Sequence, residues 1–290
     1  MTSTIKSIPL IVLLILLLFF PNHVKSQIDT SKTSIEQDSN QENYSSAILN
    51  VSYTNNNIEY LTGESENIPS LFSSISYFHK SGVYGGFGYA NYFGDQTTSY
   101  DYDIAAGYQK YFKNGFDFDL SYTWHKYSGD TILEGFNYDH AINFILAYDI
   151  NNFYFTADLT YYLGETKNYA FDLNFSRFFT INKILFKNDA LYISPSLALS
   201  FGTDFWLYEG LSGSEKTSLL SSLKQSGYSY ETFSYESFNF YLPISYGIKN
   251  TYITFSWLYT IPSKKYEYIG WQKQSGFMLS LSYFLDFSEK

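Results

Sequence analysis

The stretch that decides the fold is FDFDLSYTWH, residues 116–125. Its even positions are large and apolar, whereas its odd positions are Asp, Ser, Thr and His. Because successive side chains of a β-strand point to opposite faces, this segment has one apolar and one polar face. The same period of two runs through residues 153–163, 168–180 and 275–287. The pattern predicts amphipathic β-strands.

About twelve such segments follow one another along the chain. Most of them span about 10 to 14 residues, whereas strands of soluble proteins average about 5–6. A tilted strand that crosses a bilayer needs about 9–11 residues, so the lengths fit a membrane. The segments are 44–54, 68–79, 83–93, 100–112, 115–128, 138–150, 153–163, 168–180, 190–203, 235–248, 251–262 and 275–287.

The connections between these segments alternate in length. One set consists of short turns rich in Asn and Gly, which tolerate positive φ: 80–82, 113–115, 151–152, 249–250 and the longer 182–189. The other set is generally longer and polar: 55–67, 94–99, 129–137, 164–167, 204–234 and 263–274. This layout predicts an all-β, transmembrane antiparallel up-and-down β-barrel of about twelve strands (ten to fourteen), with short periplasmic turns and longer extracellular loops. An even strand number places both termini in the periplasm.

The alternative is a soluble β-sandwich or a lipocalin-like barrel, which buries its apolar face inside. Composition argues against it, because 62 of the 290 residues are aromatic (31 Tyr, 27 Phe and 4 Trp). The apolar face of about twelve strands is too large for one soluble core, and aromatics gather near strand ends, as in the interfacial girdles of membrane barrels. No backbone group can stay unpaired in a bilayer, so the sheet must close.

Charge and cysteine content exclude several function classes. The chain has no Cys, which removes a disulfide framework, a thiolate zinc site and a Cys nucleophile. Its net charge of −10 argues against nucleic-acid binding, which needs a basic face. We expect no cofactor.

The N-terminus reads as an export signal. Residues 1–26 combine Lys6, an apolar run over 8–20 and small residues before Gln27, as a secretory signal peptide does. The alternative is a permanent transmembrane anchor, but the apolar run is shorter than the ~20 apolar residues that a membrane-spanning helix needs. Residues 27–43 are polar and lack a period, which predicts a disordered periplasmic tether before the barrel of residues 44–290.

The last strand, GFMLSLSYFLDF over residues 276–287, resembles the C-terminal signal of Gram-negative outer-membrane β-barrels. Such signals usually end in an aromatic residue, whereas here Phe287 is followed by a three-residue overhang, 288–290. The Asn-, Lys-, Ile- and Tyr-rich composition is similar to that of Bacteroidetes proteins. This architectural resemblance covers residues 44–290. It implies location in the outer membrane, contact with its lipid, and insertion by the barrel-assembly machinery.

Six carboxylates fall on the predicted lumen face by parity: Asp101, Asp103, Asp117, Asp119, Asp158 and Asp172. Rings of Asp or Glu favour cations, which predicts a mildly cation-selective lumen. The alternative is that they only hydrogen-bond lumen Tyr, Ser and Thr. Carboxylates two residues apart also suggest Ca²⁺, but nothing in the sequence supplies further oxygen ligands, so no metal site is predicted.

The segment from His125 to Ser128 loosely resembles the His and Ser of lipid-A deacylases and outer-membrane phospholipases. Residues three apart on a strand point to opposite faces, whereas a catalytic pair needs mutual geometry. We therefore predict no catalytic residue and no enzyme. By parity, His140 faces lipid near the outer rim.

The connection 204–234 is the least generic segment. A capping box over 212–215 and leucines at helical spacing before Gly227 predict a short amphipathic helix on the extracellular side. The helix either folds into the mouth as a constriction or lies over the rim, and nearby aromatics offer either stacking platforms for a ligand or girdle residues. The residues concerned are Trp206, Tyr208, Leu219, Leu220, Leu223, Tyr228 and Tyr230.

Barrels of 8 strands are filled by side chains, and those of 16–18 strands leave an aqueous channel. A barrel of twelve strands is intermediate, so whether it conducts depends on how lumen side chains and loops fill it. The favoured hypothesis is a narrow porin-like channel for small solutes. The alternatives are a non-conducting docking barrel for surface or periplasmic partners and, third, a lipid-modifying enzyme.

Overall fold

The computed structural model describes residues 45–56, 69–93, 98–128, 138–164, 167–203, 213–225, 227–228, 233–267 and 272–287. The predicted signal peptide and tether lie outside these residues. The strands are β1 (Ser45–Thr54), β2 (Ser70–Phe78), β3 (Val83–Phe93), β4 (Thr98–Tyr111), β5 (Phe116–Ser128), β6 (Tyr138–Ile150), β7 (Phe153–Gly164), β8 (Lys167–Arg177), β9 (Phe179–Asn182), β10 (Asp189–Ile193), β11 (Ser196–Gly202), β12 (Ser234–Ile248), β13 (Thr251–Pro262) and β14 (Gln274–Phe287). Two helices are described, α2 (Gly213–Gln225) and α3 (Lys264–Glu267).

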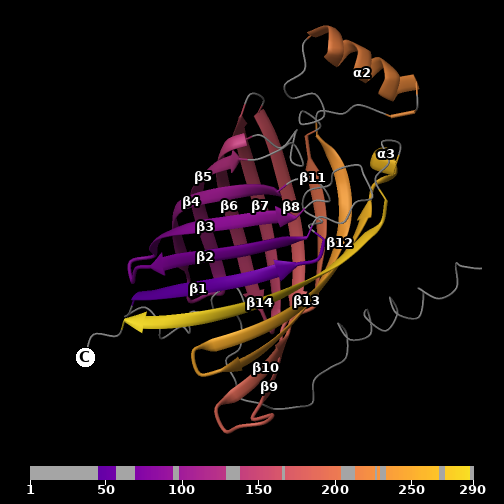
Figure 1. Cartoon of the computed structure of the whole chain (residues 1–290). Helices are drawn as coiled ribbons and strands as arrows, with labels where there is room; N and C mark the ends of the chain where they lie inside the picture. The colour runs from indigo at the N-terminus through magenta and orange to yellow at the C-terminus, as the bar shows by residue number, and fades with distance from the viewer. Residues whose placement is uncertain are drawn as a thin grey trace, which may run out of the picture.

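The strands form one closed antiparallel barrel (Figure 1). Each long strand pairs with its neighbour in sequence, and β1 pairs with β14 to join the two ends of the sheet. Because β11 pairs with both β8 and β12, no gap is left in the ring.

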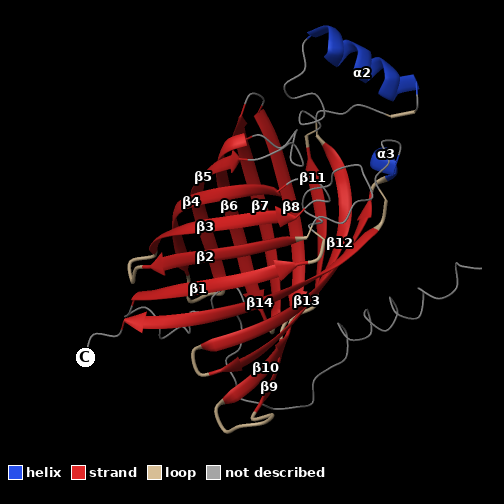
Figure 2. Ribbon diagram, in the orientation of Figure 1, coloured by secondary structure: helices blue, strands red, loops and turns tan. Residues whose placement is uncertain are grey.

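Fourteen strand segments make twelve crossings, because two crossings are interrupted. Only Phe178 separates β8 from β9, and Ser194 and Pro195 separate β10 from β11. Pro195 has no N–H to donate to a ladder, which accounts for the second break. The predicted twelve-strand barrel is therefore confirmed, and Figure 2 shows how strands dominate it.

The two faces of the wall are inverted relative to a soluble barrel. On β5, Leu120 and Tyr122 are 48% and 44% exposed, while Asp117 on the opposite face is buried. On β14, Leu279 and Leu281 are both 50% exposed. A closed barrel with an apolar exterior is the form in which strands cross a bilayer with every backbone group paired. Neither described helix is long and apolar enough to cross a membrane.

The short connections lie together at one end of the barrel, and their backbone explains their sequence. Asn151 and Asn152 both have positive φ, 53° and 67°, as a two-residue hairpin turn requires. Gly115 has φ 82°, and a Cβ there would lie 2.5 Å from the Asp149 carbonyl oxygen. These turns confirm the predicted short-turn set.

Helix α2 confirms the helix predicted in the connection 204–234. It ends before Gly227, whose φ is 98°, and the Tyr228 N–H donates to the Leu223 carbonyl over 2.9 Å. A glycine in the left-handed region just after the helix is a common C-terminal cap. Figure 1 shows α2 beyond the ends of the strands, on the side of the long connections.

Candidate functional site

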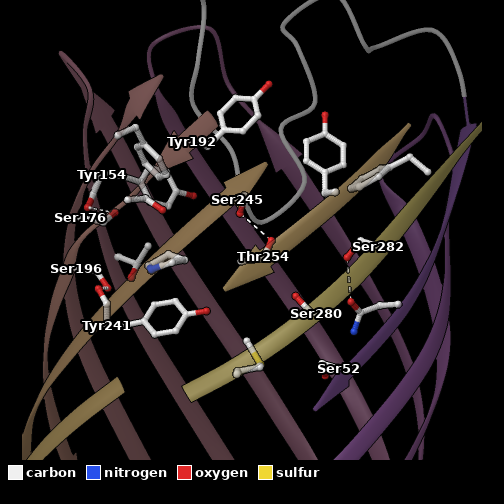
Figure 3. Close-up of a pocket in the computed structure, with 18 of the residues that line it drawn as sticks. Ser52, Tyr154, Ser176, Tyr192, Ser196, Tyr241, Ser245, Thr254, Ser280 and Ser282 are labelled. Atoms are coloured by element: carbon white, nitrogen blue, oxygen red, sulfur yellow. Dashed lines mark hydrogen bonds between the residues drawn. The ribbon is translucent and has the colours of Figure 1, made fainter. Parts of the chain in front are cut away.

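The interior of the barrel holds a cavity of about 640 Å³ that reaches the short-turn end. Its wall is built from the inward-facing positions of strands on both sides of the barrel, mostly hydroxyl and amide side chains (Figure 3). Lys249 and Asn250, in the turn between β12 and β13, mark where the cavity meets this end. The lining is thus polar from the short-turn end into the interior of the barrel.

Neighbouring strands hold this polar wall together through side-chain hydrogen bonds. The Ser282 hydroxyl donates to Asn50 Oδ1 over 2.9 Å, across the β1–β14 seam. The hydroxyls of Ser245 and Thr254 lie 2.7 Å apart on β12 and β13 (Figure 3). Because these groups satisfy one another in part and still face the cavity, the wall suits a hydrated lumen.

Charged groups in the cavity lining are mainly acidic. The lining includes Asp117, Asp149 and Asp286 together with the single basic residue Lys249. Three carboxylates and one ammonium give a formal charge of −2 at this end of the lumen.

Three of the six predicted lumen carboxylates share one row across the wall. Asp119 on β5 and Asp158 on β7 both pair in register with Ile145 of β6, which lies between them. Asp158 in turn lies opposite Asp172 of β8, and Asp172 lies opposite Ser200 of β11. The row therefore places three carboxylates in one line across neighbouring strands of the lumen wall.

Each carboxylate of this row is hydrogen-bonded by a neutral group. The Tyr84 hydroxyl donates to Asp119 over 2.8 Å, and the Asn143 amide donates to Asp158 over 2.5 Å. The Ser200 hydroxyl donates to Asp172. These hydrogen bonds are of the kind that the alternative interpretation expects, and their donors are neutral. The preference for cations stays a prediction.

Asp101 and Asp103 lie nearer the long-loop end and meet His125 there. Asp103 and His125 are opposite each other in the register of β4 and β5. Nδ1 of His125 lies 2.5 Å from Oδ1 of Asp103 and 4.0 Å from Oδ2 of Asp101.

Sequence reasoning missed this cluster, although a signal was present. The turn at 113–115 was identified, and residues equally distant from Asn114 pair in this hairpin, as Tyr111 does with Asp117. Asp103 and His125 are each eleven positions from Asn114, so hairpin symmetry predicts that they are opposite. His140 lies on the outer face as predicted, with its Nδ1 2.6 Å from the Tyr122 hydroxyl oxygen.

Of the residues predicted around the long connection, the four that the structure describes do not gather into one site. Leu219, Leu220 and Leu223 lie half-buried on α2, outside the strands. Tyr228 is buried, with its ring centroid 5.3 Å from Lys265 Nζ and 6.4 Å from the Tyr266 ring. Trp206, Tyr208 and Tyr230 lie outside the described residues.

Comparisons with known proteins agree on fold and leave function open. No protein-family model matches the chain, and no curated protein matches its sequence. Among solved structures, the chain is similar to the KdgM porin, with 10% identity and a TM-score of 0.47, covering 81% of this chain and 98% of that one. It is similar to LpxR from Salmonella typhimurium, with 9% identity and a TM-score of 0.49 over 83% and 100% of the two chains. The NanC porin matches with 7% identity and a TM-score of 0.47 over 82% and 98%. These are likenesses of fold alone, and the architectural resemblance to outer-membrane β-barrels is confirmed.

Proposed function

We propose that this barrel is a narrow outer-membrane channel for small solutes with a mild preference for cations. The observation that carries the proposal is the row of Asp119, Asp158 and Asp172 on the wall of a lumen whose short-turn end is a polar cavity. Carboxylates that gather on the wall of a pore favour cations, because their charge lowers the energy of a cation nearby.

The magnitude expected from this row is modest. In water, one elementary charge about 8 Å from a monovalent ion changes its energy by about 0.5 kcal/mol, which is about a factor of two in local concentration. Screening by salt reduces the effect further. A preference for cations of a few-fold, rather than strict exclusion of anions, follows from these charges.

The size of the cavity limits the solute. Water bound to the polar wall and the solute must share a volume of about 640 Å³, which suits small polar molecules and ions. Side chains that lie along the wall, such as Tyr84 of β3, which reaches over Gly107 of β4 to Asp119 of β5, take up part of the lumen.

The orientation belongs to the same proposal. Ser45 at the start of β1 pairs with Phe287 at the end of β14, so both ends of the barrel segment lie with the short turns. Because short turns face the periplasm in outer-membrane barrels, the proposal assigns the start of β1 and the end of β14 to the periplasmic side.

Conductance of the purified protein in a planar bilayer tests the channel directly. We expect discrete conductance steps. In a KCl gradient, the reversal potential of the current should have the sign that preferential K⁺ permeation produces. A folded, inserted barrel that gives no steps at any voltage contradicts the channel and favours the docking alternative.

A further inference from the structure

We propose that Asp101, Asp103 and His125 form a binding site for a divalent transition-metal ion of the zinc class. The three residues lie on the inner face of β4 and β5, toward the long-loop end. They are separate from the lining of the polar cavity. Their ligating atoms all lie within 4.8 Å of one another.

The geometry of the three atoms suits a small metal ion. Zn²⁺ binds imidazole nitrogen and carboxylate oxygen at about 2.0–2.2 Å, so ligands in a tetrahedral site stand about 3.3 Å apart. The distances from His125 Nδ1 to the two carboxylates, 2.5 Å and 4.0 Å, bracket this value. Small side-chain adjustments would place all three atoms around one ion.

Asp101 supplies the independent observation that points to a ligand. The residue is only 3% exposed, and its Oδ1 is buried and accepts no hydrogen bond from any described residue. A buried carboxylate oxygen left without a donor is costly, because it has lost its water without compensation. A cation bound between Asp101, Asp103 and His125 would supply the missing interaction.

The cluster is also open on one side. The side chains of His125 and Asp103 are 13% and 27% exposed, whereas that of Asp101 is 4% exposed. An ion can therefore enter past Asp103 and His125 and meet Asp101 at the base of the site. Three protein ligands with an open side leave a position for water, as in zinc sites that are not closed by a fourth residue.

The donor set indicates the class of metal. Imidazole suits Zn, Cu, Fe and Ni, whereas Ca²⁺ takes six to eight oxygen ligands. One nitrogen and two carboxylates supply too few oxygens for Ca²⁺, so the site should discriminate in favour of Zn²⁺. The register of the hairpin sets this donor combination, because it brings His125 opposite Asp103.

Calorimetric titration of the detergent-solubilised, metal-free protein with Zn²⁺, and separately with Ca²⁺, tests the proposal. We expect one saturable Zn²⁺ site per chain and much weaker binding of Ca²⁺. Loss of a second-shell partner alone commonly costs 10–100-fold in metal affinity, so loss of a ligand in His125→Gln or Asp103→Asn should cost about 100-fold or more.

Matched controls distinguish Zn²⁺ binding at this cluster from unspecific binding to other histidines and carboxylates of the barrel. His140→Gln removes a histidine from the outer face, and Asp158→Asn removes a lumen carboxylate from another level; both should bind Zn²⁺ as the unmodified protein does. Because a variant can fail to fold, visible absorption of the unmodified protein loaded with Co²⁺ provides a second test, and we expect the intense bands of a four-coordinate site. The proposal is overturned by the absence of saturable Zn²⁺ binding, by ligand variants that bind as tightly as the controls, by equal affinity for Ca²⁺, or by a six-coordinate Co²⁺ spectrum.

Discussion

Asp158 and Asp172 lie directly opposite each other on β7 and β8, with no cation among the hydrogen-bonding groups described for them. The Asn143 amide and the Thr160 hydroxyl donate to Asp158, and the Ser200 hydroxyl donates to Asp172. Like charges facing each other across strands destabilise a sheet, so this pair weakens the fold at a place where it supplies lumen charge. The proposed channel would use this pair as part of its lumen charge.

Replacing one member of the pair should therefore stabilise the protein. We expect Asp172→Asn to raise the free energy of unfolding by about 0.2–1 kcal/mol, because the amide oxygen still accepts from Ser200 while the repulsion is lost. Urea unfolding in detergent micelles, followed by tryptophan fluorescence, measures the change. Asp119→Asn is the control, since Asp119 lies opposite Gln109 and Ile145 rather than directly opposite a carboxylate, and should gain less. A loss of stability in Asp172→Asn, or an equal gain in both variants, contradicts the account.

Tyr84 lies across Gly107 inside the lumen, and this close approach should make any side chain at position 107 lower the stability of the barrel. A Cβ at Gly107 would overlap the Tyr84 ring, whose hydroxyl donates to Asp119 over 2.8 Å. We expect Gly107→Ala to cost about 1–3 kcal/mol in urea unfolding, as overpacking does. Gly85→Ala is the control, because its Cβ would only touch the Ala105 carbonyl oxygen at 3.4 Å.

A double-mutant cycle assigns this cost to the ring. In a Tyr84→Ala background the cost of Gly107→Ala should fall close to zero, since the ring that it displaces is absent. An undiminished cost would show that the strain arises elsewhere.

The hairpin between β9 and β10 is held by one carboxylate. The backbone N–H groups of Ile184, Leu185 and Phe186 donate to Asp189 over 2.8, 2.9 and 2.9 Å. In Asp189→Ala we expect these three amides to exchange hydrogen at least about tenfold faster, because local opening becomes easier. Amides of the turn 113–115 serve as the internal control. Unchanged exchange at 184–186 would mean that the carboxylate does not order the hairpin.

Tyr228 packs the chain just after α2 against α3, in the connection between β13 and β14. Its buried ring lies over Lys265 and beside Tyr266, and a cation–π contact of this kind contributes about 0.5–2 kcal/mol. We expect Tyr228→Ala to speed tryptic cleavage after the exposed Lys224 several-fold, whereas Tyr228→Phe, which keeps the ring, should cleave like the unmodified protein. Equal cleavage of all three proteins argues against an anchoring role.

Much of this fold could be predicted from local sequence because each strand carries its own period. The alternation over residues 116–125 places Leu120 outside and Asp119 inside whatever the neighbouring strands are. The breaks at Phe178 and at Ser194–Pro195 were not predicted, because period two continues across them and only the sheet shows where the ladder stops.

The candidate sites depend on register, which a single strand does not reveal. Parity alone puts six carboxylates on the lumen face, but the alignment of Asp119, Asp158 and Asp172 in one row across the wall follows from three successive strand pairings. The meeting of Asp103 with His125 follows from a turn centred on Asn114 and was accessible from the sequence. Contacts between distant segments, such as Tyr228 with Tyr266, were not.

The reversal potential of single channels in a KCl gradient tests the central claim most directly. For the unmodified protein we expect a reversal potential with the sign that preferential K⁺ permeation produces. For the triple variant D119N/D158N/D172N we expect a reversal potential closer to zero. Glu215→Gln, which removes one unit charge from the exposed helix α2, should leave the potential unchanged. A reversal potential at zero or on the anion side for the unmodified protein, or one that the triple variant leaves unaltered, would contradict the account.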